Sequence, residues 1–439
     1  MLNRILSVMA FLLALAALPA AAEIRIQEIR SPGGLTAWLS ESHDLPFIAL
    51  EIRFRGGTSL DPIQKGGVVN MMTALIEEGA GDLDTYGFAS ARDSLGAGFS
   101  FDAGADAVAV SARMLSENRD EAASLLALAL AHPRFDKEAV KRVRQQVLAN
   151  LRYENKDPAT LAARAFDAMA FGDHPYSRPG QGTEDSVAAL TRDDIIAAHQ
   201  QVLTRDHVVV AAAGDITGEE LGALIDRILG ELPVTGAALP GPAPWNLTPG
   251  VTVIDFPSPQ SLVHFGQQGM RQDDPDFYAA YILNDVLGGG RFNSRLMTEL
   301  RDKRGLTYGV GTFFANLAHA DMLLGQFSAS NDKVAEAIEI TRGEWTRIAT
   351  DGITDQELSD AKTYLTGAYP LRFDGNARIA SVLAGMQLQG FPIDYPNTRN
   401  DRINAVTAAD VKRVAARLFQ PDDLHFFVVG QPNGVQSIP

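Results

Sequence analysis

The sequence predicts an α+β fold made of two duplicated domains, and three observations support this prediction. In each half, strand-like segments come first, helical segments follow, and a buried strand closes the unit. This order is typical of helices packed on one face of a mostly antiparallel sheet. A helix-to-strand ending at 191–214 recurs at 407–430 with one offset at both ends (407 − 191 = 216 and 430 − 214 = 216). A proline-rich segment separates the halves, and a repeat of this length indicates domain duplication.

Apolar periodicity predicts the elements of the first half. Residues that alternate between apolar and polar favour strands, and apolar residues at helical spacing favour helices. The expected strands span 24–29, 36–40, 47–54, 98–103, 107–113 and 207–213, and the expected helices span 65–78, 85–95, 120–131, 136–153, 158–171, 191–203 and 217–229. Gly104-Ala105-Asp106 predicts a hairpin turn between two of these strands. Thr191 is expected to cap its helix.

Composition bounds the protein class. With 439 residues, the chain is long enough for two or three domains, and its 46% hydrophobic and 21% charged residues are ordinary for a globular protein. The formal net charge of −16 disfavours nucleic acid and anionic membrane as partners. The chain has no cysteine, which excludes disulfides, thiolate zinc sites and cysteine nucleophiles.

The N-terminus predicts secretion. Arg4 precedes an apolar run at 5–18, and small residues end the segment at Ala20-Ala21-Ala22. These are the parts of a signal peptide, which we expect at residues 1–22 with cleavage after Ala22 and a periplasmic location. A membrane anchor is the alternative, but the run is short of the ~20 residues that a span needs. We expect an N-terminal domain at 23–232, a linker at 233–250 and a C-terminal domain at 251–439.

The sequence contains no motif for an intrinsic metal site or an activated nucleophile. None of the eight histidines has a second histidine four residues later, and neither H-E-x-x-H nor H-x-x-E-H occurs. There is no G-x-S-x-G nucleophile elbow. The run 288–290 is Gly-Gly-Gly without the lysine of a phosphate loop, which favours a hinge.

The segment 288–310 is the one that could carry chemistry. Ser294 is expected to cap a short helix that runs to about Lys303, Gly305 to end it and Tyr308 to open a strand. A guanidinium at Arg301 and a phenol at Tyr308 are apt donors to peptide carbonyls or to a developing oxyanion. Taken alone the signal is modest, because arginine also suits a helix C-terminus and tyrosine commonly begins strands.

This segment resembles a signature of the pitrilysin/insulinase-type metallopeptidases. The signature runs S-R-L-x-x-x-L-R-x-x-x-G-L-x-Y, and the chain matches it throughout 294–308. The resemblance implies a clamshell of two domains. It also implies that Arg301 and Tyr308 bind substrate main chain and steady the tetrahedral intermediate formed at zinc. Phe292 and Asn293, next to the glycine run, are expected to border substrate.

The first half is similar to the family's zinc-binding domain, but without its ligands. Gly66–Leu75 aligns with the helix G-x-x-H-x-x-E-H-x, so the two ligand histidines fall on Asn70 and Ala74 and the catalytic glutamate on Thr73. The third ligand, a glutamate, falls at or near Asn150. The resemblance therefore implies that this chain binds no metal and that zinc is held by a partner.

Two functions remain open at this point. The resemblance implies a zinc-less subunit that supports peptide cleavage in complex with a homologous zinc-motif subunit and is inactive alone. The alternative is a pseudopeptidase that serves as a structural or peptide-binding scaffold. An unrelated hydrolase with paired carboxylates has no motif behind it.

Overall fold

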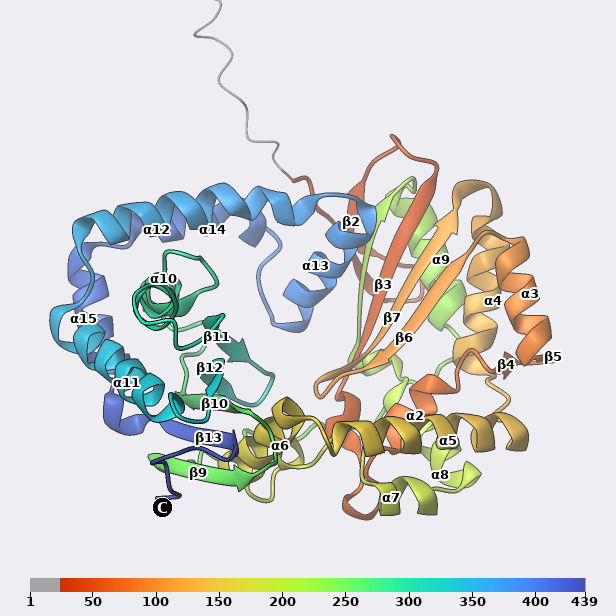
Figure 1. The fold of residues 1–439 in the computed structure, drawn as a ribbon. Coiled ribbons are helices and arrows are strands. Elements are labelled where there is room, and N and C mark those ends of the chain that lie inside the picture. Colours follow the sequence, from red (N-terminus) through yellow and green to blue (C-terminus); the bar gives the residue numbers. More distant parts are fainter. Residues whose placement is uncertain (1–23, 439) are drawn as a thin grey trace, which may run out of the picture.

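The computed structural model describes residues 24–438, so the expected signal peptide lies outside the described residues. The chain forms two α+β halves that lie side by side (Figure 1). Each half contains one large sheet with helices around it. The predicted α+β fold with two duplicated domains in a clamshell is confirmed.

The sheet of the N-terminal half has six strands. In spatial order these are β1 (Gln27–Arg30), β2 (Thr36–Glu41), β8 (Val208–Gly214), β3 (Phe47–Arg55), β7 (Ala107–Leu115) and β6 (Gly98–Ala103). Only β2 and β8 run parallel, and the other neighbours are antiparallel. A separate two-stranded ribbon joins β4 (Gly79–Ala80) and β5 (Leu83–Asp84). The predicted hairpin at residues 98–113 is confirmed by the pairing of β6 with β7.

The sheet of the C-terminal half repeats this arrangement. Its spatial order is β11 (Val310–Asn316), β12 (Asp321–Ser330), β10 (Gln260–Gln268), β13 (His425–Gly430) and β9 (Gly250–Asp255). Here β9 and β13 are the parallel pair, as β2 and β8 are in the first half. The strands β10, β12 and β11 take the places of β3, β7 and β6, so the duplication extends to the strand order.

Helices flank each sheet. Those of the N-terminal half are α2 (Val68–Ala74), α3 (Thr85–Ser94), α4 (Arg119–Ala131), α5 (Lys137–Glu154), α6 (Pro158–Phe171), α7 (Glu184–Ala189), α8 (Arg192–Val202) and α9 (Gly218–Leu229). Those of the C-terminal half are α10 (Phe277–Gly288), α11 (Val334–Asp351), α12 (Asp355–Ala368), α13 (Asn376–Leu388), α14 (Tyr395–Ala405) and α15 (Ala408–Leu418).

The helices α8 and α15 begin with the same N-terminal capping box. Thr191 accepts a hydrogen bond from the Asp194 backbone, and the Asp194 side chain accepts one from the Thr191 backbone. Thr407 and Asp410 form the same reciprocal pair at α15. The predicted cap at Thr191 is therefore confirmed, and its copy lies 216 residues later (407 − 191 = 216).

Helix α2 is shorter than the predicted helix at 65–78. Gly67 takes a left-handed backbone (φ 86°) that delays its start, and the helix ends at Ala74. Leu75 and Ile76 are fully buried but lie in a turn, because a buried position needs apolar side chains whether or not its backbone is helical. Apolar spacing alone therefore overestimated the length of this helix.

One helix of each half packs on the sheet of the other half; we call these two the exchanged helices. Helix α6 of the first half packs on β10 and β13 of the second, and α13 of the second packs on β3 and β8 of the first (Figure 1). The two helices occupy equivalent positions in the duplication. Each sheet is therefore covered by its own helices and, in addition, by one helix from the opposite half, which the sequence did not predict.

The exchanged helices make apolar cores of their own. Phe166 on α6 lies against Phe427 of β13, with ring centroids 5.7 Å apart. Leu383 on α13 belongs to a buried cluster with Trp38 and Ala211 of the first half. Because burial of apolar surface is the main favourable term in folding, these cores hold the halves together.

Between Leu229 and Gly250 the chain has neither helix nor strand. Its backbone bonds to both halves: Arg205 N–H donates to Pro233 O, and Ala243 N–H donates to His319 O. The limits 23–232, 233–250 and 251–439 stay a prediction. Within residues 24–438, no helix has the length and apolarity that crossing a bilayer demands.

Candidate functional site

The positions aligned with zinc ligands lie on two neighbouring helices. Asn70, Thr73 and Ala74 are on α2, and Asn150 is on α5, which contacts α2. Thr73 is 2% exposed, and its hydroxyl has no partner in the described chain. Ala74 and Asn150 are exposed.

These side chains do not fit zinc. Zinc in proteins takes imidazole, thiolate or carboxylate ligands, and the four positions offer two amides, a hydroxyl and a methyl group. Across residues 24–438, no group of three or more His, Cys, Asp or Glu side chains is placed to hold a metal ion. Whether the chain binds metal in solution stays a prediction.

A buried carboxylate nonetheless holds the start of α2 in place. The buried Asp61 carboxylate accepts hydrogen bonds from Gly67 N–H (2.6 Å) and Val69 N–H (2.9 Å), which satisfies donors at the helix start. Burial raises the pKa of Asp61 to about 6, although both hydrogen bonds favour its charged form.

The segment with Arg301 and Tyr308 differs in detail from the prediction. It forms a π-helical turn over Met297–Asp302, and the buried Ser294 hydroxyl makes no capping bond, so the predicted Ser294 cap is wrong. Gly305 ends the turn with φ 59°, as predicted. Strand β11 begins at Val310, so Tyr308 lies in the loop before it and does not open the strand.

Ion pairs on both sides fix the backbone of this segment. Arg295 donates two hydrogen bonds of 2.8 Å to the Glu357 carboxylate, which holds the pKa of that carboxyl at about 2 despite its burial. Glu299 pairs with Lys303 and Arg304. The charged side chains on both sides of Arg301 thus form ion pairs within the chain.

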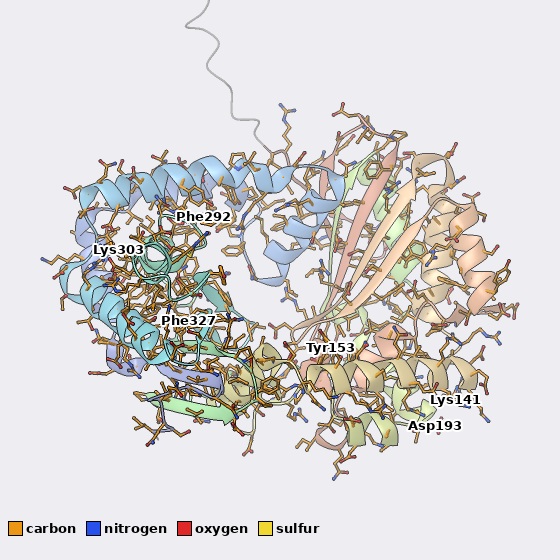
Figure 2. All side chains as sticks on the ribbon, in the orientation of Figure 1. Lys141, Tyr153, Asp193, Phe292, Lys303 and Phe327 are labelled. Carbon is orange, nitrogen blue, oxygen red and sulfur yellow. The ribbon has the colours of Figure 1, made fainter. Side chains whose placement is uncertain are left out.

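Arg301 and Tyr308 are left free as donors. Neither side chain makes a hydrogen bond or ion pair with another residue of the described chain. The Arg301 guanidinium lies 5.1 Å from the centroid of the Phe292 ring, and Tyr308 is 90% exposed. Phe292 is itself exposed, on the C-terminal half (Figure 2), and Asn293 is exposed beside it. The structure therefore brings Arg301 and Phe292 together.

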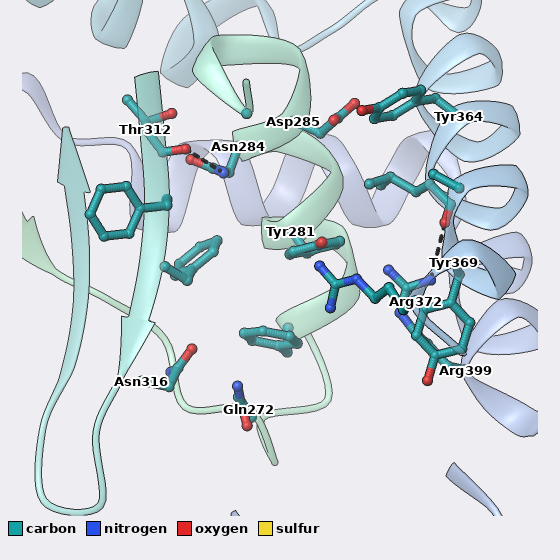
Figure 3. A pocket seen from close by; sticks show the side chains of 16 residues that line it. Gln272, Tyr281, Asn284, Asp285, Thr312, Asn316, Tyr364, Tyr369, Arg372 and Arg399 are labelled. Carbon is teal, nitrogen blue, oxygen red and sulfur yellow. Dashed lines mark hydrogen bonds between the residues drawn. The ribbon is translucent and has the colours of Figure 1, made fainter. Parts of the chain in front are cut away.

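Sequence reasoning missed a cavity in the C-terminal half. It has a volume of about 370 Å³ and lies between α10, β11, α12, the segment that follows α12, and α14 (Figure 3). Aromatic rings form much of its wall, and two guanidiniums, those of Arg372 and Arg399, reach it. Neither Arg301 nor Tyr308 lines it. No short motif contains these residues, because five separate elements contribute them.

The comparisons with known proteins agree with this architecture. Residues 189–365 match the family model described as the Peptidase M16 inactive domain. The chain is 27% identical over 395 residues to the non-peptidase homolog YmxG of Helicobacter pylori, covering 89% of this chain and 90% of the relative. It is also 27% identical over 398 residues to an uncharacterized zinc protease of Mycobacterium tuberculosis, covering 88% and 89%.

A solved structure gives the same result. The crystal structure of a peptidase M16 inactive domain from Pseudomonas fluorescens has a TM-score of 0.87 and 28% identity, and the match covers 94% of this chain and 99% of that one. In sequence and fold the chain is therefore similar to members of the M16 peptidase family, among them a non-peptidase homolog and an inactive domain.

Proposed function

We propose that this chain is the zinc-free subunit of a secreted zinc metallopeptidase. In this role Arg301 and Tyr308 bind the substrate peptide and stabilise the transition state at a zinc ion held by a homologous partner chain. One observation carries the proposal: the chain lacks zinc ligands at the aligned positions, yet it presents both donors without partners of their own.

The proposed chemistry of this chain is hydrogen bonding to charge that develops on the scissile carbonyl oxygen. A zinc ion bound by the partner supplies an activated water and polarises the carbonyl. The Tyr308 hydroxyl and the Arg301 guanidinium would donate from the opposite side. Removing one such donor in comparable oxyanion sites costs ~2.7–4 kcal/mol of transition-state stabilisation.

The position of Tyr308 suits an extended peptide. Strand β11 begins two residues later, at Val310, and lies at the edge of its sheet with β12 as its described neighbour. Such an edge can accept an added strand through main-chain hydrogen bonds. A peptide bound there would run past the Tyr308 hydroxyl.

A second candidate is a pseudopeptidase that acts as a structural or peptide-binding scaffold. The name of the Helicobacter pylori relative, a non-peptidase homolog, favours it. The two candidates differ in one respect: only the first requires the hydroxyl of Tyr308. A periplasmic location, inferred from residues 1–22, is compatible with both.

The test is reconstitution. The chain purified alone is expected to bind no stoichiometric zinc and to cleave no peptide. Addition of a zinc-motif partner from the same source is expected to give chelator-sensitive cleavage above that of the partner alone. Chelator-sensitive cleavage by the lone chain would refute the division of roles. A stable complex whose cleavage rate equals that of the partner alone would favour the scaffold.

A further inference from the structure

The cavity of the C-terminal half extends into a second hollow of about 250 Å³. The two share six lining residues: Gln272, Phe277, Tyr281, Tyr369, Arg372 and Arg399. Ligand sites in proteins are commonly ~300–1,000 Å³, walled by apolar and aromatic side chains with a few placed polar groups. The combined space belongs to that class.

One end of the cavity is cationic. Arg399 is 6% exposed, and its guanidinium lies 4.2 Å from the centroid of the Tyr369 ring and 5.6 Å from that of Tyr281. It donates to Leu365 O (3.2 Å) and to Asn400 Oδ1 (3.1 Å). Arg372 reaches the same place from the segment after α12 (Figure 3).

Neither guanidinium has an acidic partner within residues 24–438. Buried charges in proteins are normally paired, since desolvation of an unpaired charge is costly. The contrast with the rest of the chain is clear, because the formal net charge is −16 and arginines such as Arg295 and Arg413 pair with carboxylates. Arg399 is therefore a buried guanidinium without a carboxylate partner, and the exposed Arg372 reaches the same end of the cavity, so the two are placed to meet an external anion.

The other end of the cavity carries acceptors. Asn284 donates to Thr312 O (3.2 Å), while Asn284 Oδ1 and Thr312 Oγ1 are buried without partners in the described chain. Both residues are more than nine-tenths buried. Asp285 lies beside them and pairs with Arg291 at 2.6 Å. The Asn284 and Thr312 oxygens at this end could accept a hydrogen bond from an N–H group.

Aromatic rings connect the two ends. Figure 3 shows Tyr281 between Asn284 and the two guanidiniums, with Tyr369 beside Arg399. Phe277 and Phe314 pack against each other, with ring centroids 5.6 Å apart, and both line the cavity. A bound molecule therefore meets an anion site, an apolar wall and an acceptor site in that order.

We propose that this cavity binds the carboxylate of an N-acylated apolar amino acid, free or as the last residue of a peptide. The carboxylate lies against Arg372 and Arg399, the apolar side chain lies among the rings, and the amide N–H points to Asn284 and Thr312. The proposal does not depend on a zinc-bearing partner and applies to the chain alone.

Calorimetric titration of the full chain tests it. N-Acetyl-L-phenylalanine is the probe, and N-acetyl-L-phenylalaninamide, which lacks the carboxylate, is its matched control. The carboxylate is expected to bind at least about tenfold more tightly than the amide, since hydrogen bonds to charged groups are stronger than neutral ones. Equal binding of the two, or no binding of either at millimolar concentration, would overturn the proposal.

Variants locate the ligand. Arg372→Gln is expected to weaken binding of N-acetyl-L-phenylalanine about tenfold. Arg402→Gln, an exposed residue of α14 outside the cavity, should leave it unchanged. Both sites are exposed, so folding is retained. Thr312→Val, which keeps shape and removes one acceptor, should weaken the acyl amino acid but not 3-phenylpropionate. Unchanged affinity in Arg372→Gln would place any binding elsewhere and refute the assignment.

Two further probes identify the source of the ligand. A hexapeptide that ends in phenylalanine with a free carboxyl group is compared with N-acetyl-L-phenylalanine and with 3-phenylpropionate. Tighter binding of the hexapeptide than of both small acids supports a peptide terminus. Equal binding of N-acetyl-L-phenylalanine and the hexapeptide supports the free N-acyl amino acid, whereas equal binding of 3-phenylpropionate and the hexapeptide would overturn the role given to the amide N–H. The amidated hexapeptide should bind at least about tenfold less tightly in either case; if it binds as tightly as the free acid, the carboxylate site is wrong.

Discussion

Arg55 and Leu388 are joined across the two halves by a hydrogen bond of 2.6 Å from Arg55 Nη1 to the Leu388 carbonyl oxygen. Arg55 Nη2 also donates to the Gln387 carbonyl, at 2.9 Å. Arg55 is the last residue of β3, and Leu388 is the last residue of α13, so one guanidinium caps the C-terminus of the exchanged helix. Carbonyls at a helix C-terminus lack partners within the helix and carry partial negative charge.

Arg55→Gln is expected to lower the free energy of unfolding by about 2 kcal/mol, because two carbonyls lose charged donors in a partly buried place. Urea unfolding followed by circular dichroism measures it. Arg30→Gln, an exposed arginine of β1, is the control and should change stability by less than about 0.5 kcal/mol. Equal effects of the two substitutions would show that the cap does not hold α13.

Thr73→Val is expected to raise the free energy of unfolding by about 1 kcal/mol. The Thr73 hydroxyl is buried without a partner in the described chain, and a methyl group of the same shape removes that cost. Peptide cleavage by the reconstituted pair should not change, because the proposal gives Thr73 no part in the chemistry. A loss of stability would mean that the hydroxyl has a partner, and a loss of cleavage would give this position a role.

Asp167 predicts a pH dependence of stability. Burial raises the pKa of this α6 carboxyl to about 7 from an ordinary value of 3.8. Between these two values the folded chain holds a proton that the unfolded chain releases. The free energy of unfolding therefore receives the whole favourable contribution of protonated Asp167 below about pH 4. This contribution is lost as the pH rises to about 7.

Asp167→Asn removes this effect. The substitution is expected to stabilise the chain by roughly 2 kcal/mol at about pH 8 and by much less at about pH 5, because the charged form is buried only at the higher pH. Urea unfolding at the two pH values measures it. Asp173→Asn, an exposed neighbour, is the control. The same gain at both pH values would contradict a raised pKa for Asp167.

Local features of the fold were predictable from sequence. The threonine and aspartate at the starts of α8 and α15 form the same pair in both halves, and their offset revealed the duplication. Caps are encoded within four residues, so they can be identified without tertiary contacts. The hairpin of β6 and β7 is local in the same sense.

Relationships over long range were not predictable. The apolar face of α6 shows that it is buried, but its sequence does not specify that β10 and β13 of the other half cover it. Likewise Arg372 and Arg399 come from different elements, and their approach to Tyr281 appears only in the folded chain. The Ser294 cap failed because the Ser294 hydroxyl is buried without a partner, ahead of a π-helical turn over Met297–Asp302.

The central claim, that this chain supplies hydrogen-bond donors to a zinc centre on its partner, is tested most directly at Tyr308. The Tyr308→Phe chain is combined with the wild-type partner, and kcat and complex formation are measured together. Tyr308 is 90% exposed, so the fold should be unaffected. The Tyr86→Phe chain, with a similarly exposed phenol on α3 of the other half, is the control. We expect kcat to fall by about 100-fold in Tyr308→Phe alone, with unchanged assembly; an unchanged kcat would contradict the claim.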